Sequence, residues 1–355
     1  MRLQILCRGT KQGGLGHLFR TRTFARAAQA ETHDVQVVAI VEEDLESILE
    51  DLPCPVDYVR QDHEAATLVA ARRPEILVCD LTGVDAAAFE ALRGSCPLMV
   101  SLSPVFTPMD RLDAVFTRVA GTPPIPGVEL FAGMQYAVFG EQCTPIDDAA
   151  YERALSSVAL PIAVSMGGAD AANKTLKVVR ALVELELPTV IWVLLGEGYA
   201  HSYNALVRAV RAARLHEVIL AKTNRSMWQI MGNCAVAILA GGLTTVEAVY
   251  AGLPSINLFE RREHREQMRE LLERDICLDG GYFSEDSLKQ MTQKLHSLGR
   301  ARGQLREIRR RMGGAVDQHG PRRVLHALEA LHHRRRSAVS ARSMAASADV
   351  LCVSS

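Results

Sequence analysis

The chain has 355 residues, of which 48% are hydrophobic and 23% charged, as in a globular protein long enough for two domains. A net charge of −1 and an aromatic content of 5% argue against a nucleic-acid partner, which would need a basic surface and stacking side chains. The eight cysteines form no C-x-x-C pair, Arg8 ends the first apolar run, and no run reaches the ~20 residues of a membrane span. These features predict a cytoplasmic protein.

The first half of the chain alternates short β-branched runs with stretches typical of helices. Such alternation predicts a parallel sheet covered by helices on both faces. Strands are expected at residues 3–7, 35–41, 56–59, 76–80, 98–101 and 114–119, and helices at 17–30, 45–52, 64–72 and 86–93.

A Pro- and Gly-rich passage and a polar stretch, residues 121–148, interrupt this alternation before it resumes. We therefore expect two Rossmann-like doubly wound domains, 1–148 and 149–336, with ligands in the cleft between them. From residue 337 the Ser/Ala-rich sequence lacks periodicity, which predicts a disordered tail over 337–355. In the second half, strands are expected at 161–166, 189–195, 217–220, 236–240 and 255–258, and helices at 173–185, 199–214, 244–251, 264–275, 285–298 and 322–336.

The first glycine-rich turn, with Gly14, Gly16 and His17, follows the first expected strand and opens a helix. The positive end of a helix favours the neutral imidazole that a general base requires, although a histidine that only packs or caps stays an alternative. A nicotinamide-binding fingerprint is disfavoured, since Phe19 stands where it requires Gly or Ala.

A second turn of this kind, Gly241 and Gly242, leads into a helix that contains Glu247. Backbone N–H groups at such a turn suit a diphosphate, and a carboxylate one turn into the helix suits a sugar diol. The Thr244-x-x-Glu247 spacing is also that of a capping box, so a purely structural role for Glu247 stays open.

A third turn, Gly167 and Gly168, again follows an expected strand. It lacks the order of a P-loop, but its backbone N–H groups could still cradle an anion. We expect Asp170 to cap the following helix, because its charge would repel a phosphate. Further along, Gln267 could hydrogen-bond sugar hydroxyls, or could simply lie on a solvated helix face.

Taken in order, these turns resemble the GT-B nucleotide-sugar enzymes. The likeness is strongest to the spore-coat polysaccharide glycosyltransferase family, which includes the UDP-sugar hydrolase of pseudaminic acid biosynthesis, and is more distant to the GlcNAc transferase that forms lipid II. It extends to about residue 331. The motifs that carry it are Gly14-x-Gly16-His17-x-x-Arg20, Gly167-Gly168-Ala169-Asp170, Gly241-Gly242-Leu243-Thr244-Thr245-Val246-Glu247, Gly252-Leu253-Pro254 and residues 317–323.

The resemblance implies that His17 is the catalytic base, that Gly167 and Gly168 line the diphosphate, that Glu247 holds the ribose hydroxyls and that Gln267 contacts the donor sugar. It implies no metal and no cofactor. The residues expected to bind the nucleotide sugar are Gly14, Gly16, Arg20, Gly167, Gly168, Gly241, Gly242, Leu243, Thr244, Glu247 and Gln267.

The chain departs from the hydrolase pattern at three places. Asp80-Leu81-Thr82 lacks the tyrosine that the hydrolase has near the sugar. An Asp-Asp pair common after the next strand reads Ser101-Leu102-Ser103-Pro104, and the Asn-Gln near the hydrolase's active site reads Glu266-Gln267. These changes favour glycosyl transfer from a UDP-sugar in surface-glycan or nonulosonic acid biosynthesis. The alternatives are UDP-sugar hydrolysis and a sugar-nucleotide-binding protein that has lost catalysis.

Basic and apolar residues on the first helix bear on the acceptor. Arg20, Arg22 and Arg26, with Leu18 and Phe19, would suit an anionic sugar or a lipid-linked acceptor and contact with a membrane surface. A merely solvated helix face is the alternative interpretation.

Overall fold

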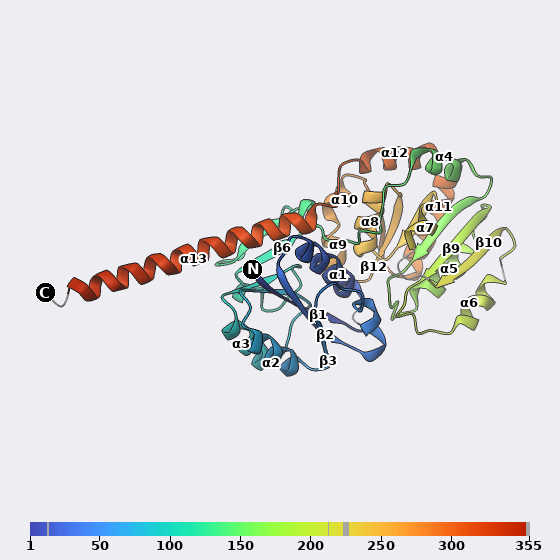
Figure 1. Cartoon of the computed structure of the whole chain (residues 1–355). Coiled ribbons are helices and arrows are strands. Elements are labelled where there is room, and N and C mark those ends of the chain that lie inside the picture. Colours follow the sequence, from blue (N-terminus) through green and yellow to red (C-terminus); the bar gives the residue numbers. More distant parts are fainter. Residues whose placement is uncertain (13, 212, 223–226, 353–355) are drawn as a thin grey trace.

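The computed structural model describes residues 1–352 except 13, 212 and 223–226, with side chains described as far as residue 338. Two α/β domains follow each other along the chain, each built on one parallel sheet with helices packed against it (Figure 1). This arrangement confirms the fold class predicted from the sequence. None of the described helices is both long and apolar enough to cross a membrane.

The first domain contains a seven-stranded sheet in the order β3-β2-β1-β4-β5-β6-β7. Both faces are buried: Ile5 packs into a core with α1, and its neighbour Leu6 into a second core with α2 and α3. The elements are β1 (Arg2–Gly9), α1 (Gly16–Ala30), β2 (Asp34–Val41), η1 (Glu43–Ile48), β3 (Val56–Val59), α2 (Asp62–Arg72), β4 (Ile76–Asp80), α3 (Ala86–Ser95), β5 (Leu98–Ser101), η2 (Met109–Arg111), β6 (Ala114–Thr117), β7 (Glu129–Ala132) and η3 (Met134–Tyr136).

The second domain repeats this topology with six strands, in the order β10-β9-β8-β11-β12-β13. One large apolar core unites its sheet and helices. The elements are α4 (Asp148–Ser156), β8 (Leu160–Ser165), α5 (Lys174–Leu182), β9 (Thr189–Leu195), α6 (Tyr203–Val210), β10 (His216–Lys222), α7 (Met227–Met231), β11 (Val236–Leu239), α8 (Leu243–Ala251), β12 (Ser255–Phe259), α9 (Arg262–Glu266), α10 (Arg269–Glu273), β13 (Leu278–Tyr282), α11 (Glu285–Arg300) and α12 (Gly303–Met312).

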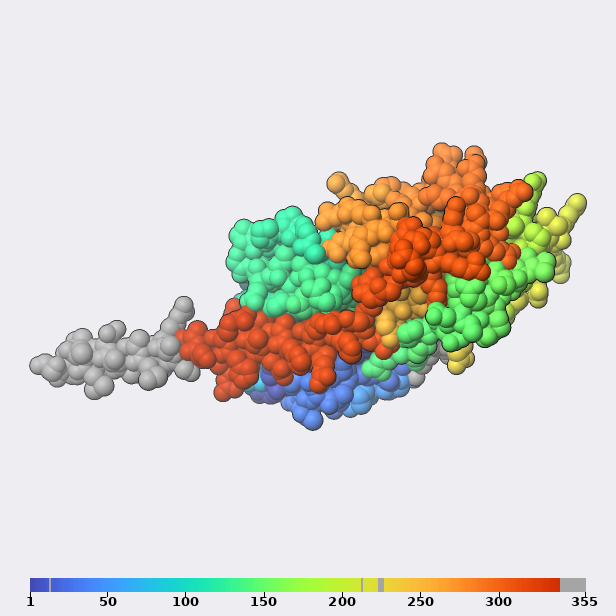
Figure 2. Space-filling model, turned by 90° about the horizontal axis from the view of Figure 1, so that it is seen from above, coloured from blue at the N-terminus to red at the C-terminus, as the bar shows by residue number. Residues whose placement is uncertain are grey.

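The last helix, α13 (Gly320–Cys352), returns to the first domain, where Figure 2 shows it in red against the blue and green residues. Val324, Leu325, Leu328 and Leu331 are buried in the core that α1 also lines. This corrects the boundary expected from the sequence: the second domain ends before Gly320, because the apolar face of α13 has its partner in the first domain.

The chain thus crosses between the domains twice, and the two crossings touch. The side-chain amide of Gln318 donates a hydrogen bond to the carbonyl of Cys143 at 2.7 Å. Gly320 lies so close to Ala137 that a Cβ atom at residue 320 would stand 1.8 Å from the Ala137 carbonyl oxygen. Only glycine fits at this position, so the close contact between the two crossings depends on Gly320.

The structure also differs from the sequence-based expectation at the end of the chain. Residues 337–352 continue α13 as helix where a disordered tail was expected, and 353–355 lie outside the described residues. Five of these sixteen residues are Ala, which favours helix even without an amphipathic period.

Candidate functional site

Each sheet reverses its winding direction between two neighbouring strands, and ligands of such folds bind at the carboxyl ends of those strands. In the first domain these strands are β1 and β4, in which Cys7 pairs with Asp80. His17 follows β1 at the start of α1, and Asp80 is the last residue of β4. The topology therefore brings together two side chains from distant parts of the sequence.

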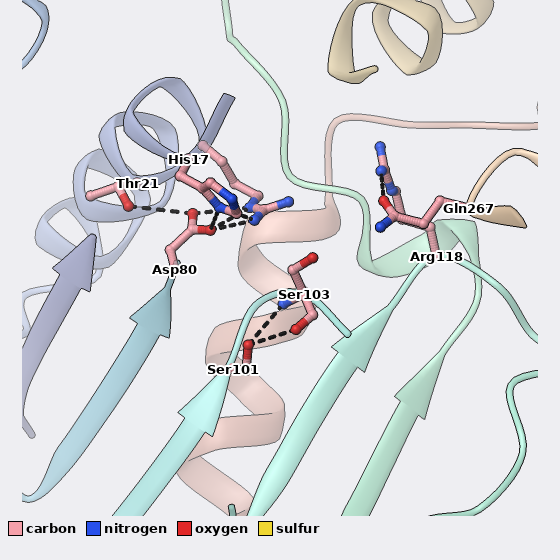
Figure 3. A network of polar contacts seen from close by, with 8 residues as sticks. His17, Thr21, Asp80, Ser101, Ser103, Arg118 and Gln267 are labelled. Atoms are coloured by element: carbon pink, nitrogen blue, oxygen red, sulfur yellow. Dashed lines mark hydrogen bonds and ion pairs between the residues drawn. The ribbon is translucent and has the colours of Figure 1, made fainter. Parts of the chain in front are cut away.

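His17 and Asp80 are in direct contact. Nδ1 of His17 lies 2.6 Å from Oδ1 of Asp80 (Figure 3). Because a carboxylate only accepts hydrogen bonds, a neutral His17 in this contact carries its proton on Nδ1, and Nε2 is then the nitrogen that can accept a proton. The side chain of His17 is 20% exposed, whereas that of Asp80 is fully buried. The pair has the arrangement of a base held and oriented by a buried acid.

Arg20 and Thr21 complete the surroundings of Asp80. Nε of Arg20 donates to Oδ2 of Asp80 at 2.9 Å, its Nη2 contacts Oδ1, and the hydroxyl of Thr21 lies 3.3 Å from Oδ2. Burial alone would raise the pKa of Asp80, but the charges of Arg20 and His17 outweigh it and lower the pKa to about 2. Asp80 therefore carries its negative charge at any physiological pH.

The second domain presents its two glycine turns at the equivalent place, after the neighbouring strands β8 and β11. Gly167 has φ +98° and Gly241 has φ +69°, which L side chains rarely adopt. A Cβ on Gly167 or Gly242 would meet no atom within 4 Å, so these turns expose backbone on the cavity side. The turns can therefore offer N–H groups to an anion, as α5 and α8 begin shortly after them.

Glu247 does not belong to a capping box. α8 begins at Leu243 with Gly242 as its N-cap, and no side chain caps it. Instead, the carboxylate of Glu247 accepts a hydrogen bond from the backbone N–H of Gly140 at 3.3 Å. Burial raises its pKa to about 7, and the Gly140 bond only partly opposes this. The geometry thus excludes the capping-box role that was the alternative to ligand binding by Glu247.

The structure confirms the capping role expected for Asp170. Its carboxylate accepts hydrogen bonds from the backbone N–H groups of Lys174 at 2.7 Å and Thr175 at 2.8 Å. The buried side chain of Lys174 forms an ion pair of 2.7 Å with Glu260, which follows β12. Lys174 is thus a cation near the third glycine turn that the sequence analysis did not select.

A cavity of about 710 Å³ lies between the two domains. This volume is in the usual range for a small-molecule site. Every site residue predicted from the sequence lines the cavity: His17, Gly14, Gly16, Arg20, Gly167, Gly168, Gly241, Gly242, Leu243, Thr244, Glu247 and Gln267. Thr82 and Ser103, at the positions that depart from the hydrolase pattern, line it too.

Besides Lys174, sequence reasoning missed two further residues near this cavity. Asp80 lies behind His17. The sequence feature that could have identified it is its position, since it is a carboxylate at the end of a buried strand. Arg118, just after β6, lines the cavity and hydrogen-bonds the side chain of Gln267 across the cleft (Figure 3). No motif marks Arg118, since only the fold brings it opposite Gln267.

The basic residues of α1 are engaged within the domain. Arg22 and Arg26 both line the cavity, and both bind the carboxylate of Asp51, Arg22 at 2.8 Å. They are therefore less available to an anionic acceptor than the sequence suggested.

No family model matches the chain. An uncharacterized protein of Methanocaldococcus jannaschii is 20% identical over 284 residues, which are 75% of this chain and 57% of that protein. The chain thus spans a little over half the length of this relative.

Solved structures resemble nearly the whole chain. MurG of Acinetobacter baumannii has a TM-score of 0.65 at 13% identity, over 93% of this chain and 99% of that chain. S. aureus MnaA with UDP has a TM-score of 0.60 at 12% identity, over 93% and 97%. The spinosyn rhamnosyltransferase SpnG with spinosyn aglycone has 0.58 at 16%, over 93% and 100%. The chain therefore has the GT-B fold, two Rossmann-like domains that face each other across a cleft.

Proposed function

We propose that the protein is a glycosyltransferase that binds a UDP-sugar in the interdomain cavity and transfers its glycosyl group. One observation carries this proposal: the His17–Asp80 pair and the glycine turns of the second domain line or flank the same cavity. A base on one wall and an anion cradle on the other are what a displacement at a nucleotide sugar needs. The GT-B fold of MurG and SpnG supports it by analogy.

In the proposed reaction, Nε2 of His17 takes the proton of an acceptor hydroxyl while that oxygen attacks the anomeric carbon. The bond from this carbon to the diphosphate oxygen breaks, and UDP leaves with the electron pair. Asp80 stabilises the imidazolium that forms. The turns at Gly167 and Gly241 hold the diphosphate through backbone N–H groups, and Glu247 accepts hydrogen bonds from the ribose hydroxyls.

Binding is tested by thermal unfolding with UDP, CDP, GDP and their sugar conjugates. A ligand at a hundred times its dissociation constant should stabilise the protein by about 2.7 kcal/mol, and we expect this for the uridine compounds. Stabilisation by none of the nucleotides would contradict the proposal.

Transfer and hydrolysis are separated by following UDP and free sugar. We expect UDP release that depends on an added acceptor fraction, a lipid extract or a polysaccharide, and that His17→Ala abolishes. Rapid release of both UDP and free sugar without acceptor would instead make the protein a UDP-sugar hydrolase. Binding without turnover in any fraction would indicate the sugar-nucleotide-binding alternative.

A further inference from the structure

The buried cations along the cavity differ in how their charge is balanced. Arg20 is paired with Asp80, Arg22 with Asp51 and Lys174 with Glu260. Arg118 makes no ion pair with any described residue, and its Nη2 donates a hydrogen bond to the neutral amide of Gln267. A guanidinium in a partly buried cavity thus has no protein counter-charge in contact with it.

Arg118 also retains unused hydrogen-bonding capacity. Its Nη1 atom is buried and has no partner within the described part of the chain. An unsatisfied donor on a charged group costs more than one on a neutral group, so such donors are normally matched. Burial and the nearby charge of Arg20 lower the pKa of Arg118 to about 9, and the charge of Asp80, which makes no contact with it, opposes this only in part. The unpaired donor of Arg118 therefore destabilises the free protein. A bound anion would reduce this cost by accepting a hydrogen bond from the guanidinium.

The position of Arg118 indicates which part of a ligand it meets. It follows β6 in the first domain, on the wall opposite the glycine turns, and it touches Gln267, the residue implied to contact the donor sugar. The turns at Gly167 and Gly241 already supply N–H groups for a diphosphate. Because the diphosphate is assigned to these turns, we expect Arg118 to bind a second anionic group next to the sugar.

We infer that Arg118 is a specificity-determining residue that binds a carboxylate on the glycosyl group, so that the donor is a UDP-uronic acid or a similarly acidic UDP-sugar. This inference rests on the proposed function. A planar guanidinium suits a carboxylate because two parallel hydrogen bonds can form.

The test measures binding of UDP, UDP-glucose and UDP-glucuronate by calorimetry, with UDP-galactose and UDP-galacturonate as a second matched pair. Each pair differs only in carrying a hydroxymethyl group or a carboxylate. We expect the wild type to bind the acidic member on the order of 10- to 100-fold more tightly in at least one pair. Arg118→Met should abolish this preference, and Arg118→Lys should keep part of it.

Arg265→Met is the matched control. Arg265 lies on α9 near Gln267, but its guanidinium pairs with Asp279 and does not line the cavity. Its removal changes the net charge equally and should leave the preference intact. Gln267→Glu gives a second variant that keeps Arg118 in place: the new carboxylate should occupy Arg118 and abolish the preference even if Arg118→Met fails to fold.

Three results would overturn the inference. The wild type could show no preference for the acidic member of either pair. Arg118→Met could weaken UDP itself as much as UDP-glucuronate, which would make the diphosphate the partner of Arg118. The control could lose the preference equally, which would make net charge the cause. Absence of any UDP binding by the wild type would instead contradict the proposed function, on which the inference depends.

Discussion

Nδ1 of His17 and Oδ1 of Asp80 lie 2.6 Å apart although 63 positions separate the two residues in the chain. The contact exists because β1 and β4 are neighbours in the sheet and both side chains stand at the carboxyl ends of these strands. It orients the imidazole, with Nδ1 toward Asp80 and Nε2 away from it. The two residues should therefore act as one catalytic unit.

Replacing His17 by Ala should lower kcat by about 10²–10⁴-fold and change UDP affinity by no more than about twofold, because a general base acts in the transition state. Asp80→Asn should lower kcat by a smaller factor of at least about tenfold, since it removes the charge that stabilises the imidazolium. Single-turnover kinetics and UDP titrations measure both quantities. Full activity of His17→Ala would refute this role.

Glu247 should make the free protein less stable as the pH rises. Its folded-state pKa of about 7 exceeds the ordinary value of 4.5, so between these pH values the folded protein holds a proton that the unfolded chain has lost. The cost is absent below about pH 4.5 and complete above about pH 7. Glu247→Gln should remove it and raise the free energy of unfolding by roughly 1–3 kcal/mol at pH 8, with little change at pH 4.5.

Glu247, which lowers the stability of the free protein, should strengthen the binding of nucleotide. Glu247→Ala should weaken UDP binding by on the order of 10- to 100-fold, the usual loss for a charge-assisted hydrogen bond. Calorimetric titration of UDP into wild type and variant measures this change. A variant that binds UDP like the wild type would assign Glu247 to the Gly140 contact alone.

The glycine turn after β8 packs against Gly196, the residue that follows β9. A Cβ on Gly196 would lie 2.4 Å from the carbonyl oxygen of Gly168, so Gly196→Ala must displace this turn. We expect Gly196→Ala to weaken UDP binding by at least about tenfold, because misplaced N–H groups lose their hydrogen bonds. Gly94→Ala in α3, where a Cβ meets nothing within 4 Å, is the control and should leave binding unchanged. Equal UDP affinity in both variants would contradict the role given to the turn.

The returning helix should stabilise the first domain. Leu328 of α13 is fully buried in the core of that domain, and Leu328→Ala should cost roughly 2–5 kcal/mol of unfolding free energy. Hydrogen exchange should show the loss in β1 and α1 before the second domain is affected. An exposed residue of the same helix, His326, offers a control, since a surface substitution to Ala changes stability by no more than about 0.5 kcal/mol. Equal losses from both variants would show that the packing of α13 contributes little.

The strand–helix alternation and the glycine turns could be read from the sequence because these features are local. β6 and β12 have clear β-branched or apolar runs, whereas β7 and β13 were missed: β7 is short and follows a Pro-rich passage, and β13 contains Gly280 and Gly281. Asp80 and Arg118 could not be assigned, since their partners are set by strand order and domain packing rather than by spacing. The packing of α13 against the first domain could not be assigned either, because the apolar surface that it covers is formed by residues far away in the sequence.

The contact between the two crossings restricts how the domains can move. Since Gly320 lies against Ala137 and Gln318 against Cys143, the two connections cannot bend independently. We expect the domains to open by rotation about an axis through these two connections. Such rotation would separate Arg118 from Gln267, which hydrogen-bond across the cavity. A substrate carboxylate that takes the place of Gln267 on Arg118 would change this contact between the domains, so the rate of product release should differ between acidic and neutral donors.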